Sequence, residues 1–158
     1  MKYTVCLFLV LLTISCGKDD SPEAVQPLEP KDYTAQNETE ITEYLVENDL
    51  VSQKSETGLD YIIEKQGDGL KPDATSNVTV FFKGYFLDGT VFEENTDDGI
   101  TADLAAFIPG WVEGISYFNE GGKGVLLIPA HLGYGSSYFN GIPPGSVLLF
   151  DIELFSVN

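Results

Sequence analysis

The side chains that usually perform covalent chemistry are scarce in this sequence. His131 is the only histidine, and Cys6 and Cys16 are the only cysteines. A catalytic triad needs a histidine beside its nucleophile, a structural zinc site needs several Cys or His ligands, and a phosphate loop needs a glycine-rich run that ends in lysine. The sequence contains none of these patterns. We therefore expect neither a metal ion nor any other cofactor, and we interpret His131 as a loop residue.

Aromatic residues are instead concentrated close to segments rich in glycine and proline. The set comprises Phe82, Phe92, Phe107, Trp111, Tyr134, Tyr138, Phe139 and Phe150. Many of these rings must belong to a core, and the simplest interpretation is that they all do. However, residues 129–145 form a Gly/Pro-rich segment in which a core does not require aromatic side chains. Aromatic rings in such a loop are typical of a pocket for an apolar ligand.

The elements that must position these rings follow from the residue pattern. Strands are predicted at residues 59–65, 78–86, 90–92, 124–128 and 147–157. Asp88-Gly89 marks a hairpin turn, since glycine accepts a positive φ. Residues 109–119 form a short helix that begins with Pro109, whose missing N–H costs nothing in a first turn. This order predicts an α+β fold, in which an antiparallel β-sheet wraps around one short α-helix.

An additional N-terminal helix is predicted over residues 37–51, within a segment that we bound at 37–56. Ile41, Tyr44 and Leu45 follow the spacing of a helical face, and Asn37 is a suitable N-cap residue. The narrow apolar face suggests that this helix docks on a neighbouring surface. The alternative is a loosely packed spacer.

The charge of the chain excludes one large class of partners. The 158 residues carry 25 Asp and Glu against 8 Lys and no Arg, which gives a formal net charge of −17. Nucleic-acid binding needs clustered cationic side chains, so we expect no nucleic-acid partner. Residues 93–99 are predicted to be an acidic loop. They lack the spacing of a calcium-binding loop, and we favour a solvated loop over a calcium site.

The N-terminus has the features of an export signal. Residues 1–15 combine a positive start with a short apolar run that is too short to span a bilayer. Small residues before Cys16 resemble a bacterial lipobox, so Cys16 is the predicted lipidation site, followed by an acidic, Pro-containing tether at residues 16–36. The alternative is ordinary secretion with a chance cysteine. We expect a lipid anchor in the bacterial cell envelope, at the outer membrane, with the protein facing the periplasm or the surface.

Several blocks in residues 78–158 resemble the FKBP-type peptidyl-prolyl cis–trans isomerase family. In chain order they are Val80-x-x-Lys83-Gly84-Tyr85-x-x-Asp88-Gly89-Thr90-x-Phe92, Phe107-Ile108-Pro109-Gly110-Trp111-x-Glu113-Gly114, Leu127-Ile128-Pro129, Tyr134-Gly135, Gly141-Ile142-Pro143-Pro144 and Leu148-x-Phe150-Asp151-Ile152-Glu153-Leu154. The resemblance implies an FKBP-like domain over residues 57–158 and an isomerase that assists the folding of exported proteins. It implies proline-containing polypeptide segments and macrolide inhibitors as ligands.

The same resemblance implies roles for individual residues. The catalytic set would be Tyr134, Ile108, Trp111, Phe92 and Glu93, and the substrate-binding set Phe82, Phe107, Phe139, Ile142 and Phe150. Trp111 would form the floor beneath the proline ring. The Ile108 N–H and the Tyr134 hydroxyl would each hold a substrate carbonyl, and Phe139 would sit in the loop that overhangs the pocket.

Two positions depart from the family pattern. The family usually has Tyr where this chain has Phe82 and Asp where it has Glu93, and in the family those two side chains form a hydrogen bond across the pocket. Phe82 has no hydroxyl and cannot form it. The alternative function is therefore an FKBP-like peptide-binding or chaperone module with weak or no isomerase activity. A third hypothesis is a structural surface lipoprotein that uses the fold as a scaffold.

Overall fold

The computed structural model describes residues 30–158. The predicted signal at residues 1–15, Cys16 and most of the predicted tether lie outside the described residues. The elements are α1 (Thr34–Glu47), β1 (Gln53–Lys54), β2 (Asp60–Lys65), β3 (Asn77–Tyr85), β4 (Val91–Asp103), the 3-10 turn η1 (Leu104–Ala106), α2 (Pro109–Ile115), β5 (Gly122–Ile128), the 3-10 turn η2 (Ala130–Leu132) and β6 (Leu148–Val157).

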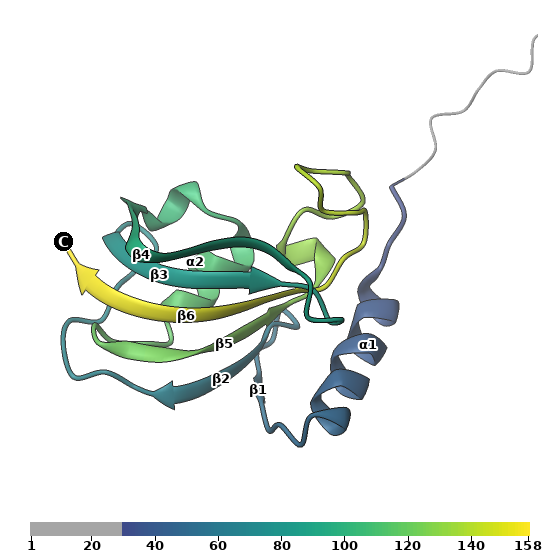
Figure 1. The fold of residues 1–158 in the computed structure, drawn as a ribbon, viewed down its shortest axis with the longest axis horizontal. Helices are drawn as coiled ribbons and strands as arrows, with labels where there is room; N and C mark the ends of the chain where they lie inside the picture. The colour runs from purple at the N-terminus through teal and green to yellow at the C-terminus, as the bar shows by residue number, and fades with distance from the viewer. Residues whose placement is uncertain (1–29) are drawn as a thin grey trace, which may run out of the picture.

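The strands form one six-stranded sheet, in which every neighbouring pair is antiparallel. The strand order is β1-β2-β5-β6-β3-β4. The sheet curves around α2, while α1 lies at one end of the sheet (Figure 1). The predicted α+β fold, with its antiparallel sheet, short helix and additional N-terminal helix, is confirmed.

Alternate residues of the central strands face two different layers. In β6, Leu148 and Phe150 belong to the main core around α2, whereas Leu149 belongs to a second cluster with Ile41 of α1. The same alternation places Leu126 of β5 in the main core and Leu127 in the second cluster. This is the two-residue period of a strand. The sheet is therefore covered by α2 on one face and, near one end, by α1 on the other.

Two glycines allow α2 to lie close to the sheet. A Cβ atom added at Gly110 would lie 2.5 Å from Ile128 Cγ2, and one added at Gly114 would lie 2.7 Å from Leu126 Cδ1. Both distances are shorter than any relaxed carbon–carbon contact. Pro109 occupies the first turn of α2, as the sequence predicts, but the helix ends at Ile115 rather than at residue 119; its N-cap residue is Ile108. The close approach fixes the position of the side chains that α2 carries.

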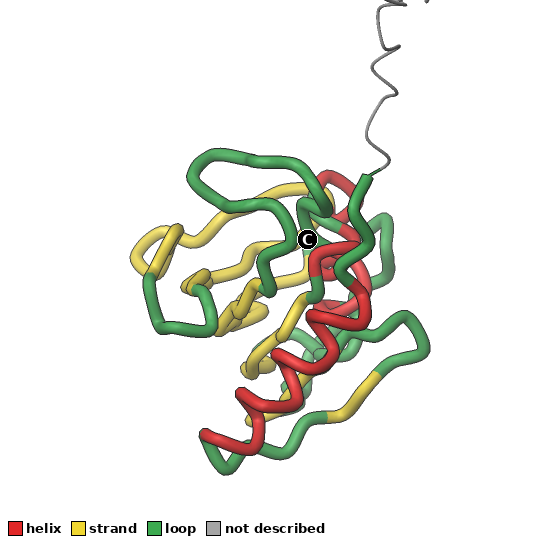
Figure 2. Tube along the Cα trace, turned by 90° about the vertical axis from the view of Figure 1, so that its right-hand side faces the viewer, coloured by secondary structure: helices red, strands yellow, loops and turns green. Residues whose placement is uncertain are grey.

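The N-terminal helix docks on the sheet, but its bounds and its capping differ from the prediction. It spans Thr34–Glu47 rather than residues 37–51, and its N-cap residue is Tyr33, so the prediction that Asn37 caps the helix is wrong. Asn37 is fully buried inside the helix, where it hydrogen-bonds to distant parts of the chain. Figure 2 shows α1 in red, with its first turns beside the loops at one end of the sheet.

The acidic segment at residues 93–99 is not a loop, so this prediction is also wrong. It belongs to β4, which pairs with β3 on both sides of an irregularity: Val80 pairs with Ile100, and Phe82 pairs with Asn95. The extra residues form a bulge, closed by a 3.1 Å hydrogen bond from Asn95 Nδ2 to the Gly99 carbonyl oxygen. A bulge lets a strand accommodate additional residues without ending its pairing, which residue type alone does not reveal.

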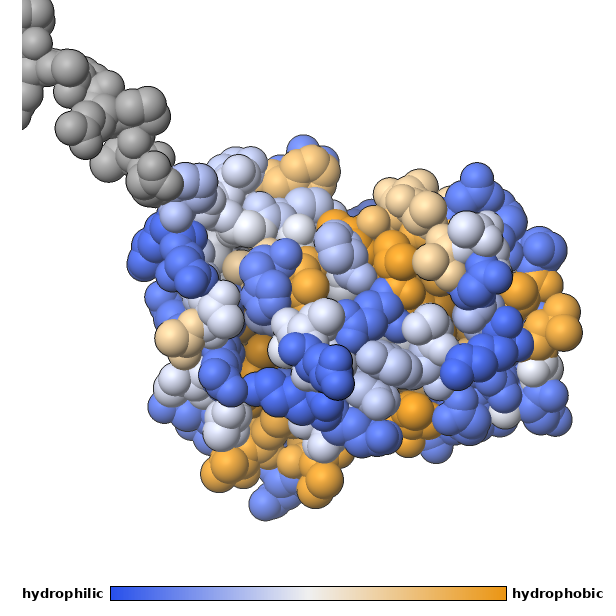
Figure 3. All heavy atoms as spheres, turned by 180° about the vertical axis from the view of Figure 1, so that it is seen from behind, coloured by the Kyte–Doolittle hydropathy of each residue, from blue (hydrophilic) through white to orange (hydrophobic). Residues whose placement is uncertain are grey.

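The face of the protein seen in Figure 3 is mainly hydrophilic, with separate apolar patches. Within residues 30–158, no helix is both long enough and apolar enough to cross a membrane.

Candidate functional site

Trp111 lies at the centre of a group of aromatic rings that we call the aromatic cluster. Its members are Phe82 of β3, Phe86, Phe92 of β4, Phe107, Trp111 of α2 and Phe150 of β6. The Trp111 ring is 3% exposed. Its centroid lies 5.0 Å from that of Phe82, 4.8 Å from Phe107 and 5.2 Å from Phe150. Five of the predicted site residues therefore meet in one place.

The strand side of the cluster depends on a glycine that sequence reasoning did not assign to the site. A Cβ atom at Gly84 would lie 2.7 Å from Phe92 Cε2 and 2.8 Å from Phe150 Cε1. Phe86, also not assigned, lies 4.9 Å from Phe92 between ring centroids. The available signal for Gly84 was its place inside a run of strand-forming residues, where a glycine often marks a close approach.

The remaining predicted rings come from the loop between η2 and β6. The rings of Tyr134 and Phe139 are stacked, with centroids 4.3 Å apart and planes 11° from parallel. Phe139 and Ile142 exchange two backbone hydrogen bonds of 3.1 and 2.7 Å, which close the tip of the loop. Ile142 is buried in the main core, whereas Phe139 is 44% exposed. Phe139 therefore contacts Tyr134 rather than the rings of the aromatic cluster.

Two of the hydrogen-bond donors predicted to hold the substrate have no acceptor among residues 30–158. These are the Ile108 backbone N–H, at the start of α2, and the Tyr134 hydroxyl. Burial and the nearby negative charge of Glu93 raise the pKa of Tyr134, so the phenol keeps its proton at neutral pH. Trp111 Nε1 is also buried without a partner in this part of the chain.

The structure explains why the pair at Phe82 and Glu93 cannot interact as it does in the family. Phe82 is 5% exposed and packs edge-on against Trp111 inside the core. Glu93 lies in β4 with an exposed side chain. No hydroxyl is available at Phe82 to reach the carboxylate. Glu93 acts on the site through its charge, which reaches Tyr134.

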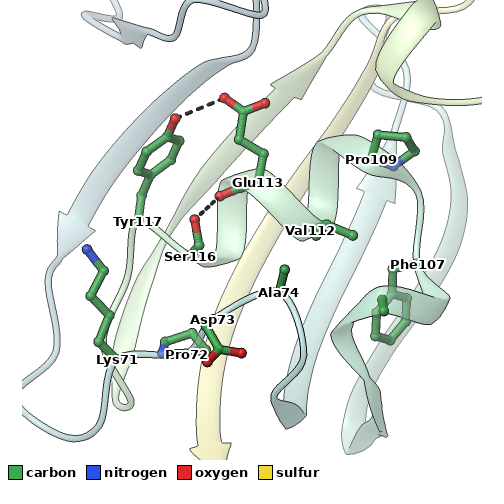
Figure 4. A pocket seen from close by; sticks show the side chains of 11 residues that line it. Lys71, Pro72, Asp73, Ala74, Phe107, Pro109, Val112, Glu113, Ser116 and Tyr117 are labelled. Carbon is green, nitrogen blue, oxygen red and sulfur yellow. Dashed lines mark hydrogen bonds between the residues drawn. The ribbon is translucent and has the colours of Figure 1, made fainter.

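A separate groove of about 740 Å³ runs along the outer side of α2. Figure 4 shows Lys71 and Pro72 on one side of it and α2 with Tyr117 on the other; the Tyr117 hydroxyl donates to the Glu113 carboxylate at 2.9 Å. Phe107 is shared with the aromatic cluster, but the groove contains neither Tyr134 nor Trp111. Within residues 30–158, no group of three or more His, Cys, Asp or Glu residues is arranged to hold a metal ion.

Comparison with known proteins gives a consistent result. A family model described as FKBP-type peptidyl-prolyl cis-trans isomerase matches residues 69–155. FKBP-type peptidyl-prolyl cis-trans isomerase FkpA of Buchnera aphidicola subsp. Schizaphis graminum is 44% identical over 107 residues, which cover 66% of this chain and 42% of that protein. FkpA of Escherichia coli strain K12 is 41% identical over 105 residues, or 65% of this chain and 39% of that protein.

Solved structures agree with this comparison. The crystal structure of FkpA from Escherichia coli matches with a TM-score of 0.71 and 36% identity, over 79% of this chain and 61% of that chain. A peptidyl-prolyl cis-trans isomerase from Pseudomonas syringae pv. tomato matches with a TM-score of 0.68 and 27% identity, over 82% of this chain and 98% of that chain. The chain spans less than half the length of the curated relatives that it matches.

Proposed function

The chain belongs to the FKBP-type peptidyl-prolyl cis–trans isomerase family, and on this premise we propose that it catalyses the cis–trans isomerisation of X-Pro bonds in polypeptides. The observation that carries the proposal is the cluster of aromatic rings around Trp111, with Ile108 and Tyr134, which carry unpaired donors, packed against the same core. A proline ring needs an apolar surface, and the carbonyls around it need donors.

The proposed catalysis rests on the polarity of the site. Rotation about a peptide bond has a barrier of about 18–20 kcal/mol, because it interrupts amide resonance. The twisted amide carries less charge on its oxygen than the planar one and loses less by leaving water. A dry aromatic surface therefore favours the twisted state relative to the planar state. This route needs no nucleophile, metal or redox group.

The two donors orient the substrate and leave the apolar floor free for the proline. The Ile108 N–H sits at the N-terminus of α2, beside Phe107 and Trp111. The Tyr134 hydroxyl approaches from the loop, and its raised pKa keeps it a donor through neutral pH. Held at both points, the substrate backbone would stay fixed while the X-Pro bond turns.

A tetrapeptide assay tests the isomerase proposal. The full chain should accelerate the cis-to-trans conversion of a proline-containing tetrapeptide, measured by NMR exchange, which needs no coupling protease. Tyr134→Phe should lower kcat/KM, whereas Tyr138→Phe, in the same loop but 70% exposed, should leave it unchanged. If the wild-type chain gives no acceleration but still binds the peptide, the isomerase proposal fails.

A second candidate function is a peptide-binding or chaperone module. The burial of Phe82 and the unpaired Glu93 support it, because the pocket lacks one polar contact across its floor. The double variant Phe82→Tyr with Glu93→Asp restores both residue types of the family. A rise in kcat/KM with unchanged peptide affinity would mean that the natural Phe82 and Glu93 pair limits turnover, as a binding module requires. Unchanged turnover would mean that this pair gives no reason to prefer a binding module.

We also propose that the protein is tethered to the bacterial cell envelope through a lipidated Cys16, with proline-containing segments of exported proteins as its clients. Support comes from the sequence pattern before Cys16, since these residues lie outside the described part of the chain. Cys16→Ala should move the protein from the membrane fraction to the soluble fraction. Unchanged membrane association would exclude this anchor.

A further inference from the structure

Asn37 of α1 is hydrogen-bonded to both ends of the loop that carries Tyr134. Its Nδ2 donates to the Gly145 carbonyl oxygen at 2.9 Å, and its Oδ1 accepts from the Ala130 N–H at 2.8 Å. Nδ2 donates its second hydrogen atom to Glu40 Oε2, at an N–O distance of 3.0 Å. Asn37 is fully buried. Every hydrogen-bonding group of this side chain is therefore used, and two of its partners lie far away along the chain.

The two ends of the loop are also tied to each other. The Gly145 N–H donates to the Gly135 carbonyl oxygen at 2.9 Å, and the Gly135 N–H donates to the Ala130 carbonyl oxygen at 2.8 Å. The Asn37 amide connects the same two ends, because it bonds to both Ala130 and Gly145. Buried polar networks that are fully satisfied fix a single local geometry, because any alternative leaves a buried group unpaired.

The residue before α1 adds a shape constraint. A Cβ atom added at Gly145 would clash with the Tyr33 ring, so that ring lies directly on the loop backbone. Gly145 also has a φ of +78°, which other residues rarely adopt. Figures 1 and 2 show the start of α1 beside this end of the sheet. Packing and hydrogen bonds thus act on the loop at the same point.

We propose that Asn37 is a positioning residue for the substrate site: it fixes residues 130–145, and through them Tyr134 and Ile142, relative to the aromatic cluster. This role rests on the proposed isomerase function. Asn37 itself does not reach the substrate. A leucine of similar size would pack well at this buried position but could form no hydrogen bond to either end of the loop. The contribution of the Asn37 amide is therefore to position the loop and not to bury apolar surface.

Hydrogen exchange of the full chain tests the clamp directly. In Asn37→Leu, amide protons of residues 133–145 should exchange about 10-fold faster, while those of β5 keep their wild-type rates. Asn48→Ala is the matched control, because Asn48 ends the same helix and bonds only locally, to the Tyr44 carbonyl oxygen at 2.8 Å. Wild-type loop exchange in Asn37→Leu, or an equal increase in β5, would overturn the proposal.

Kinetics separate positioning from general stability. Asn37→Leu should raise KM for a proline-containing tetrapeptide by about 2- to 10-fold, the equivalent of one or two lost hydrogen bonds, with kcat changed by less than about twofold. If kcat of Asn37→Leu falls only in proportion to the concentration of active protein, Asn37 stabilises the fold and does not position the site. If wild-type protein shows no turnover, the proposed function fails, while the exchange result still decides the clamp.

Two further variants keep the test informative if Asn37→Leu folds poorly. Tyr33→Ala removes only the ring above Gly145 and should loosen the loop in the same direction, by a smaller factor. Asn37→Asp has the shape of asparagine. When ionised it would face the Glu40 carboxylate and the Gly145 carbonyl oxygen with no proton to donate, whereas its neutral acid form can both donate to Gly145 and accept from Ala130. Its KM should therefore fall toward wild type as the pH is lowered through the pKa of the new carboxyl group. A KM that does not depend on pH, relative to wild type, would contradict the assigned hydrogen bonds.

Discussion

The two sides of the proposed substrate site are built in different ways. The aromatic cluster is part of the core, where Trp111 and Phe150 are almost completely buried and lie on regular elements. Opposite it, the loop of residues 130–145 has only a short 3-10 turn and carries exposed rings at Tyr138 and Phe139. Its position depends on bonds to α1 across 93 and 108 residues of sequence.

The difference separates two kinds of mutation. A change in the aromatic cluster alters the core and the site together, so stability and activity should fall together. A change in the exposed or half-exposed rings of the loop removes few buried apolar contacts, so activity should fall with little loss of stability.

Trp111→Ala should have the largest effect. Removing a large buried aromatic side chain costs about 3–5 kcal/mol of unfolding free energy, and peptide binding should be lost with the floor. Urea unfolding followed by circular dichroism measures the first effect. Tyr138→Ala, at a 70% exposed ring, should change stability by less than about 0.5 kcal/mol. Similar losses in both variants would mean that the cluster and the loop are not distinct in stability.

Gly84→Ala should have the next largest effect. The new methyl group would meet the rings of Phe92 and Phe150 at less than 3 Å, and overpacking of this kind costs about 1–3 kcal/mol. Peptide affinity should fall as the rings move apart. Lys83→Ala, at the adjacent position on the opposite face of β3, is the control. Wild-type stability in Gly84→Ala would show that the rings adjust freely.

Tyr134→Phe should affect activity alone. The hydroxyl has no acceptor among residues 30–158, so its removal should change stability by less than about 0.5 kcal/mol. Loss of one hydrogen bond to the substrate should lower kcat/KM by about 2- to 10-fold. Parallel unfolding and isomerase measurements decide the matter. A large loss of stability would mean that Tyr134 supports the core as the aromatic cluster does, which would contradict the difference between the cluster and the loop.

Glu93→Gln should give the smallest effect, and it reports on the place where the two sides face each other. Burial is the larger cause of the raised pKa of Tyr134, and the Glu93 carboxylate adds to it by opposing formation of the phenolate. Removing the charge should lower that pKa, which ultraviolet titration can measure as the difference from a Tyr134→Phe background. An unchanged titration curve would show that the Glu93 charge on β4 has no electrostatic effect on Tyr134 in the loop.

The sign of the pH dependence follows from the same shift. Tyrosines in the unfolded chain ionise near pH 10. Because folded Tyr134 has a raised pKa, its contribution to stability is complete below about pH 10 and is lost as the pH rises through the folded pKa. Tyr134→Phe should therefore lose less stability than the wild type on going from pH 9 to pH 11.

Much of the fold could be predicted because its signals are local. The Asp88-Gly89 turn and the start of α2 at Pro109 each depend on neighbouring residues, and both appear as expected. The bulge in β4 was missed because the acidic composition of residues 93–99 resembles a loop, while pairing with β3 maintains the strand. Tertiary pairing overrode the local preference.

The site was predicted unevenly for the same reason. The rings of the aromatic cluster follow from a family pattern, but the close approach at Gly84 depends on β3 meeting the rings of β4 and β6 in space. Asn37 was assigned to the wrong role because a short polar residue near a helix start usually caps it. Its true partners, Ala130 and Gly145, are recognisable only once the chain has folded.

The position of Tyr33 and α1 ahead of the strands in the sequence has a mechanical consequence. A pulling force applied at Pro30 reaches Tyr33 and the first turn of α1 before it reaches any strand of the sheet. The Asn37 bonds to Ala130 and Gly145 therefore carry the load first, while the central strands β5 and β6 remain paired along their whole length. Tension on the N-terminal side would therefore load the Asn37 clamp, and with it the loop of residues 130–145, before the strand pairing of the sheet.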